Sequence, residues 1–249
     1  MIALGYGLAF IIGLSLGLLG GGGSILTVPV LHYVLRFGVR EAIPMSLVVV
    51  GLTSGFGAVA HHRSGTVDFR AAMLFAPAAI VGALLGAELG LRTSPVVQLT
   101  VFAVVMILAA ISMWLGHARL QERETAPATR HPLPYMLLLG GAVGLLTGFA
   151  GVGGGFLYVP ALVLLAGLPM KRAVGTSLVL ILLSCMAGFA RYQGSLALDW
   201  RSIVLFTAIA FAGVATGSRM VRRISTPALR RGFALLLLVM GVVVLTVGR

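Results

Sequence analysis

The sequence predicts an all-α integral membrane protein made of two homologous, inverted repeats. Hydrophobic residues make up 59% of its 249 residues and charged residues only 10%, which leaves too little polar surface for a water-soluble domain of this size. Successive apolar runs reach the length needed to cross a bilayer. A glycine-rich stretch also occurs twice, at residues 17–30 and 148–161.

Charge and cysteine content exclude several other classes. The formal net charge is +12, but the basic residues lie in short gaps between apolar runs, as in membrane proteins, so we expect no nucleic-acid partner. The single cysteine, Cys185, lies inside an apolar run and predicts neither a disulfide framework nor a metal or redox site. With no HExxH motif, paired mid-span carboxylates or Ser/His/Asp order, we expect neither an enzyme nor a cofactor.

The first half is expected to hold four spanning helices and one half-helix. Residues 24–36 are too short to cross the membrane and carry Pro29 in their first turns, which predicts a half-helix that starts at the glycines. The polar stretch 61–68 predicts a loop with solvated histidines. The first span lacks the features of a signal peptide and is expected to stay in place. The spans are 2–20, 41–61, 69–91 and 95–116.

The second half repeats this order. The polar, proline-containing segment 117–132 is the expected cytoplasmic linker between a first membrane repeat, 1–116, and a second, 133–249. Equivalent positions include Ser46 and Ser177, Asp68 and Asp199, and Gly82 and Gly213, so we expect the duplication to cover both halves. The expected half-helix is 156–168, and the expected spans are 133–150, 172–191, 202–221 and 228–248.

The distribution of Lys and Arg predicts that the repeats are inverted. If each broken element folds back as a hairpin, each half crosses the membrane an odd number of times, and twelve of the eighteen basic residues fall on one side. If each broken element instead crosses the membrane once, ten basic residues fall on one side and eight on the other. The positive-inside rule favours the uneven split, which places the linker in the cytoplasm and both termini outside a multi-pass protein of the cell membrane.

The two glycine runs, Gly20–Ser24 and Gly151–Gly155, interrupt apolar segments and should break a helix. Broken backbone persists in a membrane only where protein buries it or where water and solute line it, and matched breaks in two halves indicate a transporter's binding site. The alternative is that the glycines only let helices pack closely, which needs the spacing of Gly82 and Gly86. No strand or lysine accompanies them, which excludes a nucleotide-binding loop.

We predict that the N-termini of the two half-helices approach each other near the midplane and bind a small anion. Free peptide N–H groups and the positive ends of helix dipoles attract negative charge. Hydroxyl groups nearby in sequence could complete the site, although a single Ser or Thr in a membrane helix often bonds to its own backbone. The predicted site is Gly21, Gly22, Gly23, Ser24, Thr27, Ser46, Gly153, Gly154, Gly155, Tyr158, Thr176 and Ser177.

The few acidic residues favour structural interpretations. Glu88 lies four residues before Arg92, which predicts an ion pair near a helix end, with proton coupling through Glu88 as the alternative. Asp68 and Asp199 directly precede expected spans, where an acidic residue suits the N-cap.

The glycine-to-proline patterns at 17–29 and 148–160, with the segments 171–178 and 61–68, resemble the TauE/SafE family of sulfite and organosulfonate exporters. The resemblance covers nearly the whole chain, but residues 194–199 depart from the family's loop. It implies transport of small anions, often sulfur-containing, by two homologous halves. We therefore expect a small anionic solute and a lipid bilayer as partners. Whether the protein forms a homo-oligomer stays open.

From the repeats we expect alternating access, in which one repeat rocks against the other around the anion site. Two other functions stay open. One is a passive anion channel of the same architecture, and the other is a membrane scaffold that moves no solute.

Overall fold

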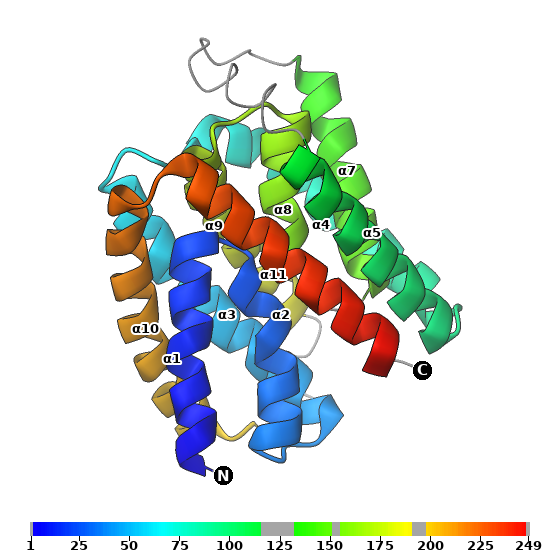
Figure 1. Ribbon diagram of the computed structural model, residues 1–249. Coiled ribbons are helices and arrows are strands. Elements are labelled where there is room, and N and C mark those ends of the chain that lie inside the picture. The colour runs from blue at the N-terminus through cyan, green and yellow to red at the C-terminus, as the bar shows by residue number, and fades with distance from the viewer. Residues whose placement is uncertain (1, 116–131, 151–154, 191–197, 248–249) are drawn as a thin grey trace.

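The computed structural model describes residues 2–115, 132–150, 155–190 and 198–247. They form helices without any strand in this part of the chain, which confirms the all-α prediction (Figure 1). Apart from residue 132, the expected linker lies outside the described residues. The helices are α1 (Ile2–Leu19), α2 (Gly22–Pro29), α3 (Val39–His62), α4 (Phe69–Leu91), α5 (Pro95–Leu115), α7 (Leu133–Ala150), α8 (Gly155–Pro160), α9 (Met170–Ala190), α10 (Trp200–Arg223) and α11 (Thr226–Val247).

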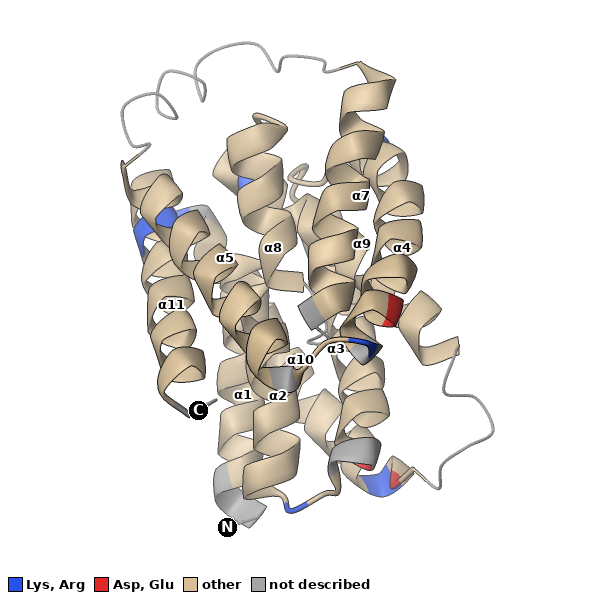
Figure 2. Cartoon of the chain, turned by 90° about the vertical axis from the view of Figure 1, so that its right-hand side faces the viewer, with Lys and Arg blue, Asp and Glu red and all other residues tan. Residues whose placement is uncertain are grey.

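In the described chain, six helices are long and apolar enough to cross a membrane, namely α3, α4, α5, α9, α10 and α11. The expected spans at 2–20 and 133–150 form α1 and α7, whose apolar stretches, 5–19 and 133–149, are shorter. Figure 2 shows the charged residues mostly at helix ends and connections, with uncharged residues along the middles of the helices. The protein is therefore a multi-pass membrane protein.

Each predicted half-helix consists of an α-helical part and a π-helical turn. α2 continues as η1 (Val30–Val34), and α8 continues as η2 (Ala161–Leu165). The change occurs directly after Pro29 in one case and after Pro160 in the other. Proline has no N–H and interrupts the regular α-helical hydrogen-bond pattern, and in both half-helices the chain continues past it in the wider π turn without ending the helix.

The two half-helices also end alike. Arg36 and Gly167 occupy equivalent positions and both have positive φ, 64° and 66°. A left-handed residue at this place closes a helix by letting the following N–H groups reach its last carbonyls. Both half-helices therefore stop well short of a full span, as their lengths in the sequence predict.

Helices pair across the two repeats. α1 packs along α10, α4 along α7, α3 along α9, and α5 along α11. The α1–α10 and α4–α7 contacts are especially close, because a side chain at Gly13 would overlap the carbonyl of Ala210, and one at Gly86 would overlap the carbonyl of Leu145. The close approach expected at Gly82 and Gly86 is confirmed. The described parts of the first and second halves of the chain thus interlock and are not two separately packed units.

Local predictions at the helix ends are mostly confirmed. The Asp68 carboxylate accepts a hydrogen bond from the Ala71 N–H, and the Asp199 carboxylate caps α10 in the same way. Glu88 and Arg92 form the expected ion pair at 2.9 Å.

One expectation at the loop is wrong. α3 extends to His62, and the His61 side chain, expected to be solvated, is only 2% exposed. It is buried because its ring reaches back to α1, where Nε2 lies 3.1 Å from the Gly17 carbonyl oxygen.

Candidate functional site

The first break is a sharp reversal of the chain. α1 ends at Leu19, Gly20 adopts a left-handed φ of 78°, and α2 begins at Gly22. α2 then folds back along α1, so closely that a side chain at Gly23 would overlap the carbonyl of Ile12. Left-handed backbone without strain requires glycine at residue 20. The predicted break is therefore confirmed in the first half.

Of the second glycine run, Gly151–Gly155, residues 151–154 lie outside the described residues, and with them the predicted site residues Gly153 and Gly154. α7 ends before this segment and α8 begins after it. Gly155, the first residue of α8, is buried.

The first turns of the two half-helices touch. A side chain at Gly21 would overlap the carbonyl of Gly155 and the Cα of Phe156. A side chain at Gly155 would in turn lie 2.8 Å from Ile181 and 3.0 Å from the Ser24 hydroxyl. In Figure 2, α2 and α8 extend in opposite directions from this contact in the interior. The structure thus brings Gly21, Ser24 and Gly155 together.

Ser177 lies beside the same break. Its hydroxyl faces Gly20 and donates to the Val174 carbonyl at 2.8 Å. Ser46, at the equivalent position in α3, donates to the Ile43 carbonyl at 2.6 Å. Both serines bond to their own helix, the alternative expected for hydroxyls in membrane helices.

Hydroxyls on α2 behave similarly. Ser24 donates to the Gly21 carbonyl at 2.7 Å, and Thr27 donates to the Gly23 carbonyl at 3.0 Å. These bonds leave hydroxyl oxygen lone pairs but no hydroxyl hydrogen for a solute. The donors at this end of α2 are its first peptide N–H groups, since its N-cap, Gly21, provides no side-chain cap.

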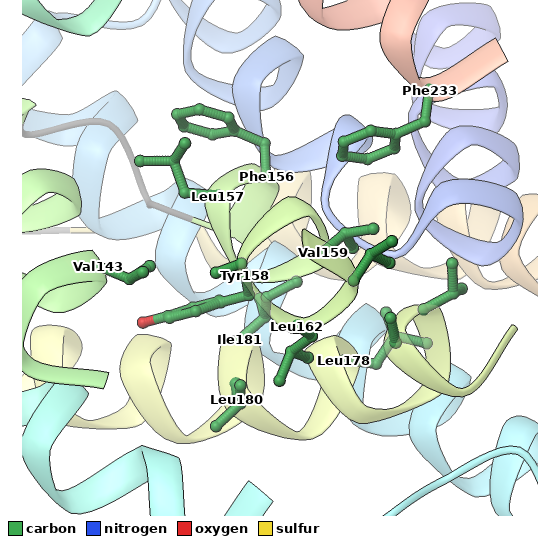
Figure 3. Packing of buried hydrophobic residues seen from close by; sticks show 14 of the residues in the cluster. Val143, Phe156, Leu157, Tyr158, Val159, Leu162, Leu178, Leu180, Ile181 and Phe233 are labelled. Carbon is green, nitrogen blue, oxygen red and sulfur yellow. The ribbon is translucent and has the colours of Figure 1, made fainter. Parts of the chain in front are cut away.

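Tyr158 and Thr176 point elsewhere. The Tyr158 hydroxyl forms a 2.7 Å hydrogen bond with Ser184, and its ring lies among Val143, Leu180 and Ile181 (Figure 3). The Thr176 hydroxyl accepts a 3.0 Å bond from the Asp68 N–H, which ties α9 to the connection before α4.

Sequence reasoning missed two polar groups next to the break. The Ser15 hydroxyl oxygen is shielded from solvent, has no hydrogen-bond partner among the described residues, and faces Gly22. His61 contacts the last turn of α1. A lone serine inside an apolar span, less than two turns before the glycines, is the signal that could have indicated Ser15.

Comparison with known proteins identifies relatives over nearly the whole chain. The family model described as "Sulfite exporter TauE/SafE" matches residues 6–244. A "Probable membrane transporter protein" of Xylella fastidiosa strain Temecula1 is 32% identical, covering 94% of this chain and 91% of the relative. Another of strain 9a5c is 33% identical with the same coverage. The Bacillus subtilis "Probable membrane transporter protein YunE" is 27% identical over 94% of this chain and 96% of its own.

Proposed function

The chain belongs to the TauE/SafE family and is a membrane transporter, and we propose that its solutes are small anions bound where the half-helices meet. The observation that carries this proposal is the uncapped start of α2, buried against α8 beside the unpaired Ser15 hydroxyl. Peptide N–H groups and a serine hydroxyl are neutral donors, and neutral donors can hold and release an anion.

The lack of acidic groups in this region supports an anionic solute. Among the residues whose burial is described, no Asp or Glu is buried, so no carboxylate there would repel negative charge. The family model's description names sulfite. We therefore propose sulfur-containing oxyanions or organosulfonates as the solute class.

The chain direction supports an inverted arrangement of the repeats. In Figure 1, α1 runs upward from the N-terminus, whereas α7, its equivalent, runs downward from the opposite end. We propose that the end of the molecule at which α5 ends and α7 begins faces the cytoplasm of a cell membrane, because the uneven distribution of basic residues favours that orientation.

The interlocked packing suggests which parts move together. Close glycine contacts join α1 to α10 and α4 to α7, and pulling either pair apart would cost much packing energy. We propose that alternating access moves the body containing α1 and α10 against the body containing α4 and α7. Each moving body then holds helices from both repeats, with the half-helix contact between them.

An anion panel tests the proposal. We expect sulfite, thiosulfate or methanesulfonate, but not choline, to raise the unfolding temperature of the purified protein, because a ligand at 100 times its Kd adds about 2.7 kcal/mol. Gly22→Leu should abolish this response and transport with insertion intact, because an added Cβ there would lie 3.0 Å from the Ser15 hydroxyl and would overlap a methyl group of Leu236, which must move aside. Gly7→Leu, where nothing lies within 4 Å of an added Cβ, is the matched control.

Two outcomes would favour the alternatives. Anion flux that never accumulates against its gradient, under any imposed proton or sodium gradient, indicates a passive channel. A protein that responds to none of the anions is better explained as a scaffold. An unaltered flux in Gly22→Leu would place the binding site elsewhere.

A further inference from the structure

We propose that His61 is a proton-binding site that couples proton movement to the anion transport proposed above, on which this inference rests. His61 is a fully interior imidazole, 2% exposed, in the last turn of α3. Imidazole is the side chain that exchanges a proton near neutral pH. Its two ring nitrogens connect the first helix break to the loop that follows α3.

The first connection follows from the break itself. In an unbroken helix the Gly17 carbonyl would accept from the N–H of residue 21, but the Gly21 N–H donates to Leu19 at 2.9 Å. The Gly17 carbonyl instead lies 3.1 Å from His61 Nε2. A carbonyl oxygen can only accept, so Nε2 carries a hydrogen and donates. His61 therefore bonds the turn that leads directly into the proposed anion site.

The second connection provides a place for an added proton. The Thr66 hydroxyl oxygen lies 3.0 Å from His61 Nδ1 and 3.0 Å from the His61 backbone carbonyl. A hydroxyl has one hydrogen. In neutral His61, Thr66 donates that hydrogen to Nδ1. When a proton binds to Nδ1, Nδ1 donates to the Thr66 oxygen and the hydroxyl hydrogen turns to the carbonyl. The ring can thus gain or lose a proton with both bonds kept and no heavy atom displaced.

The surrounding charges favour binding of a proton and an anion together. α9 packs at Gly175 against the Thr66 backbone and His61, and α10 packs against Gly17. The charged or titratable residues closest in sequence to these contacts include His62, Arg63, Asp68 and Arg70 after His61, Lys171 and Arg172 before Gly175, and Arg219 and Arg223 after the part of α10 that packs at Gly17. Most are basic and disfavour a further positive charge. A bound anion offsets this repulsion and so favours protonation of His61, and by linkage a protonated His61 strengthens anion binding.

Two further effects act in the same direction. His61 lies at the C-terminal end of α1, where the negative end of the helix dipole favours a cation. Moving a monovalent anion with one proton also carries no net charge across the apolar interior, where isolated charges are costly.

Proteoliposomes with trapped pyranine test this proposal, using thiosulfate or methanesulfonate, whose charge is constant between about pH 5 and 8. Exchange of labelled anion at equal pH is measured first. In the wild-type protein, an inward proton gradient of one pH unit should raise uptake about fivefold to tenfold, and the lumen should acidify as anion enters. His61→Gln, which can still donate to Gly17 but cannot titrate, should keep exchange within about twofold and lose both gradient effects.

The adjacent His62 provides the matched control, because it is exposed and stacks edge-on against Phe69. His62→Gln should behave as wild type. If His61→Gln fails to insert, Thr66→Val, which removes only the relay hydroxyl, should uncouple uptake from the gradient, and Thr66→Ser should restore coupling.

The outcomes separate the two proposals. Wild-type uptake that ignores the proton gradient, or a gradient response that survives in His61→Gln, overturns the proton site and leaves the anion site standing. Failure of every anion to bind or exchange at equal pH in the wild-type protein overturns both.

Discussion

Two helix contacts of this protein are built alike. In the α1–α10 contact, a side chain at Gly13 would overlap the carbonyl of Ala210, and in the α4–α7 contact a side chain at the equivalent Gly144 would overlap that of Ala79. The two half-helices, in contrast, differ where their sequences are aligned. At the equivalent positions of the paired helices, Gly13 and Gly144, both halves have glycine, since any side chain there would force the helices apart.

At the half-helices the side chains have diverged. α2 carries Ser24 and Thr27, which bond to its own backbone, where α8 carries Gly155 and Tyr158. The Tyr158 hydroxyl leaves its own half-helix and bonds to Ser184 on α9. The paired helices are therefore alike, but the two half-helices that meet between them are not. A solute bound where the half-helices meet would contact different groups on its two sides.

The largest effect is expected from a substitution that separates the half-helices. Gly21 has φ −108° and ψ −17°, which alanine tolerates, so Gly21→Ala tests only the overlap with Gly155 and Phe156. We expect a loss of about 3 kcal/mol, the upper end for overpacking, together with loss of transport. Thermal unfolding and flux measure both.

Gly7→Ala is the control for this change, because an added methyl group there meets nothing within 4 Å. It should not lower stability, and the better helix propensity of alanine should raise it by about 0.5 to 1 kcal/mol. A Gly21→Ala protein with wild-type stability and flux would show that the half-helices are not in tight contact.

The second prediction tests the likeness of the two glycine contacts. Gly13→Ala and Gly144→Ala should each cost about 2 kcal/mol, because each methyl group meets a backbone carbonyl that cannot rotate away. The free energies of unfolding of the two variants should agree within about 0.5 kcal/mol. Gly232→Ala, with open space around it, should cost nothing and should gain up to about 1 kcal/mol from helix propensity. A difference above about 1 kcal/mol would show that the two contacts are not equivalent.

Much of this architecture could be predicted from the sequence because the signals are local. The first glycine run ends α1 as predicted, and Pro29 and Pro160 lie at the same distance from the two runs. Asp68 and Asp199 cap the helices that directly follow them. Each of these features depends on residues within a turn or two, so hydropathy and spacing were enough.

The features that could not be predicted from the sequence depend on contacts between segments that are far apart in it. The spacing of Gly82 and Gly86 predicts a close helix partner but not that the partner is α7 of the other repeat. His61, followed by Arg63, Ser64 and Gly65, has the composition of a loop. Only the fold shows that the first break frees a carbonyl for it. The sequence did not indicate Ser184 for the same reason, because its partner, Tyr158, lies on another helix.

A smaller effect on stability is expected at Tyr158, an aromatic residue of the second half-helix. Tyr158→Phe removes the 2.7 Å hydrogen bond to Ser184 in a buried setting and should cost about 1 kcal/mol. Thr27→Val, in the other half-helix, removes only a bond to its own helix and should cost less. Comparing Tyr158→Phe, Ser184→Ala and the double variant in unfolding experiments isolates the pair. Equal costs for Tyr158→Phe and Thr27→Val would contradict the asymmetry.

The smallest effect concerns the second repeat's helix cap at low pH. The Ser202 hydroxyl donates to the exposed Asp199 carboxylate at 2.7 Å and, with the Ser202 and Arg201 N–H groups, lowers the pKa of Asp199. Because the folded-state pKa lies below the unfolded value, the cap's contribution is complete above about pH 4 and is lost as the pH falls through the lowered pKa. Ser202→Ala removes the largest cause and brings the folded-state pKa closer to the unfolded value, so its unfolding temperature should fall by less, and over a narrower pH range, than that of the wild-type protein. Asp199→Asn should flatten this part of the pH profile, and superimposable profiles for the wild-type protein and Ser202→Ala would show that the hydroxyl does not stabilise the ionised carboxylate.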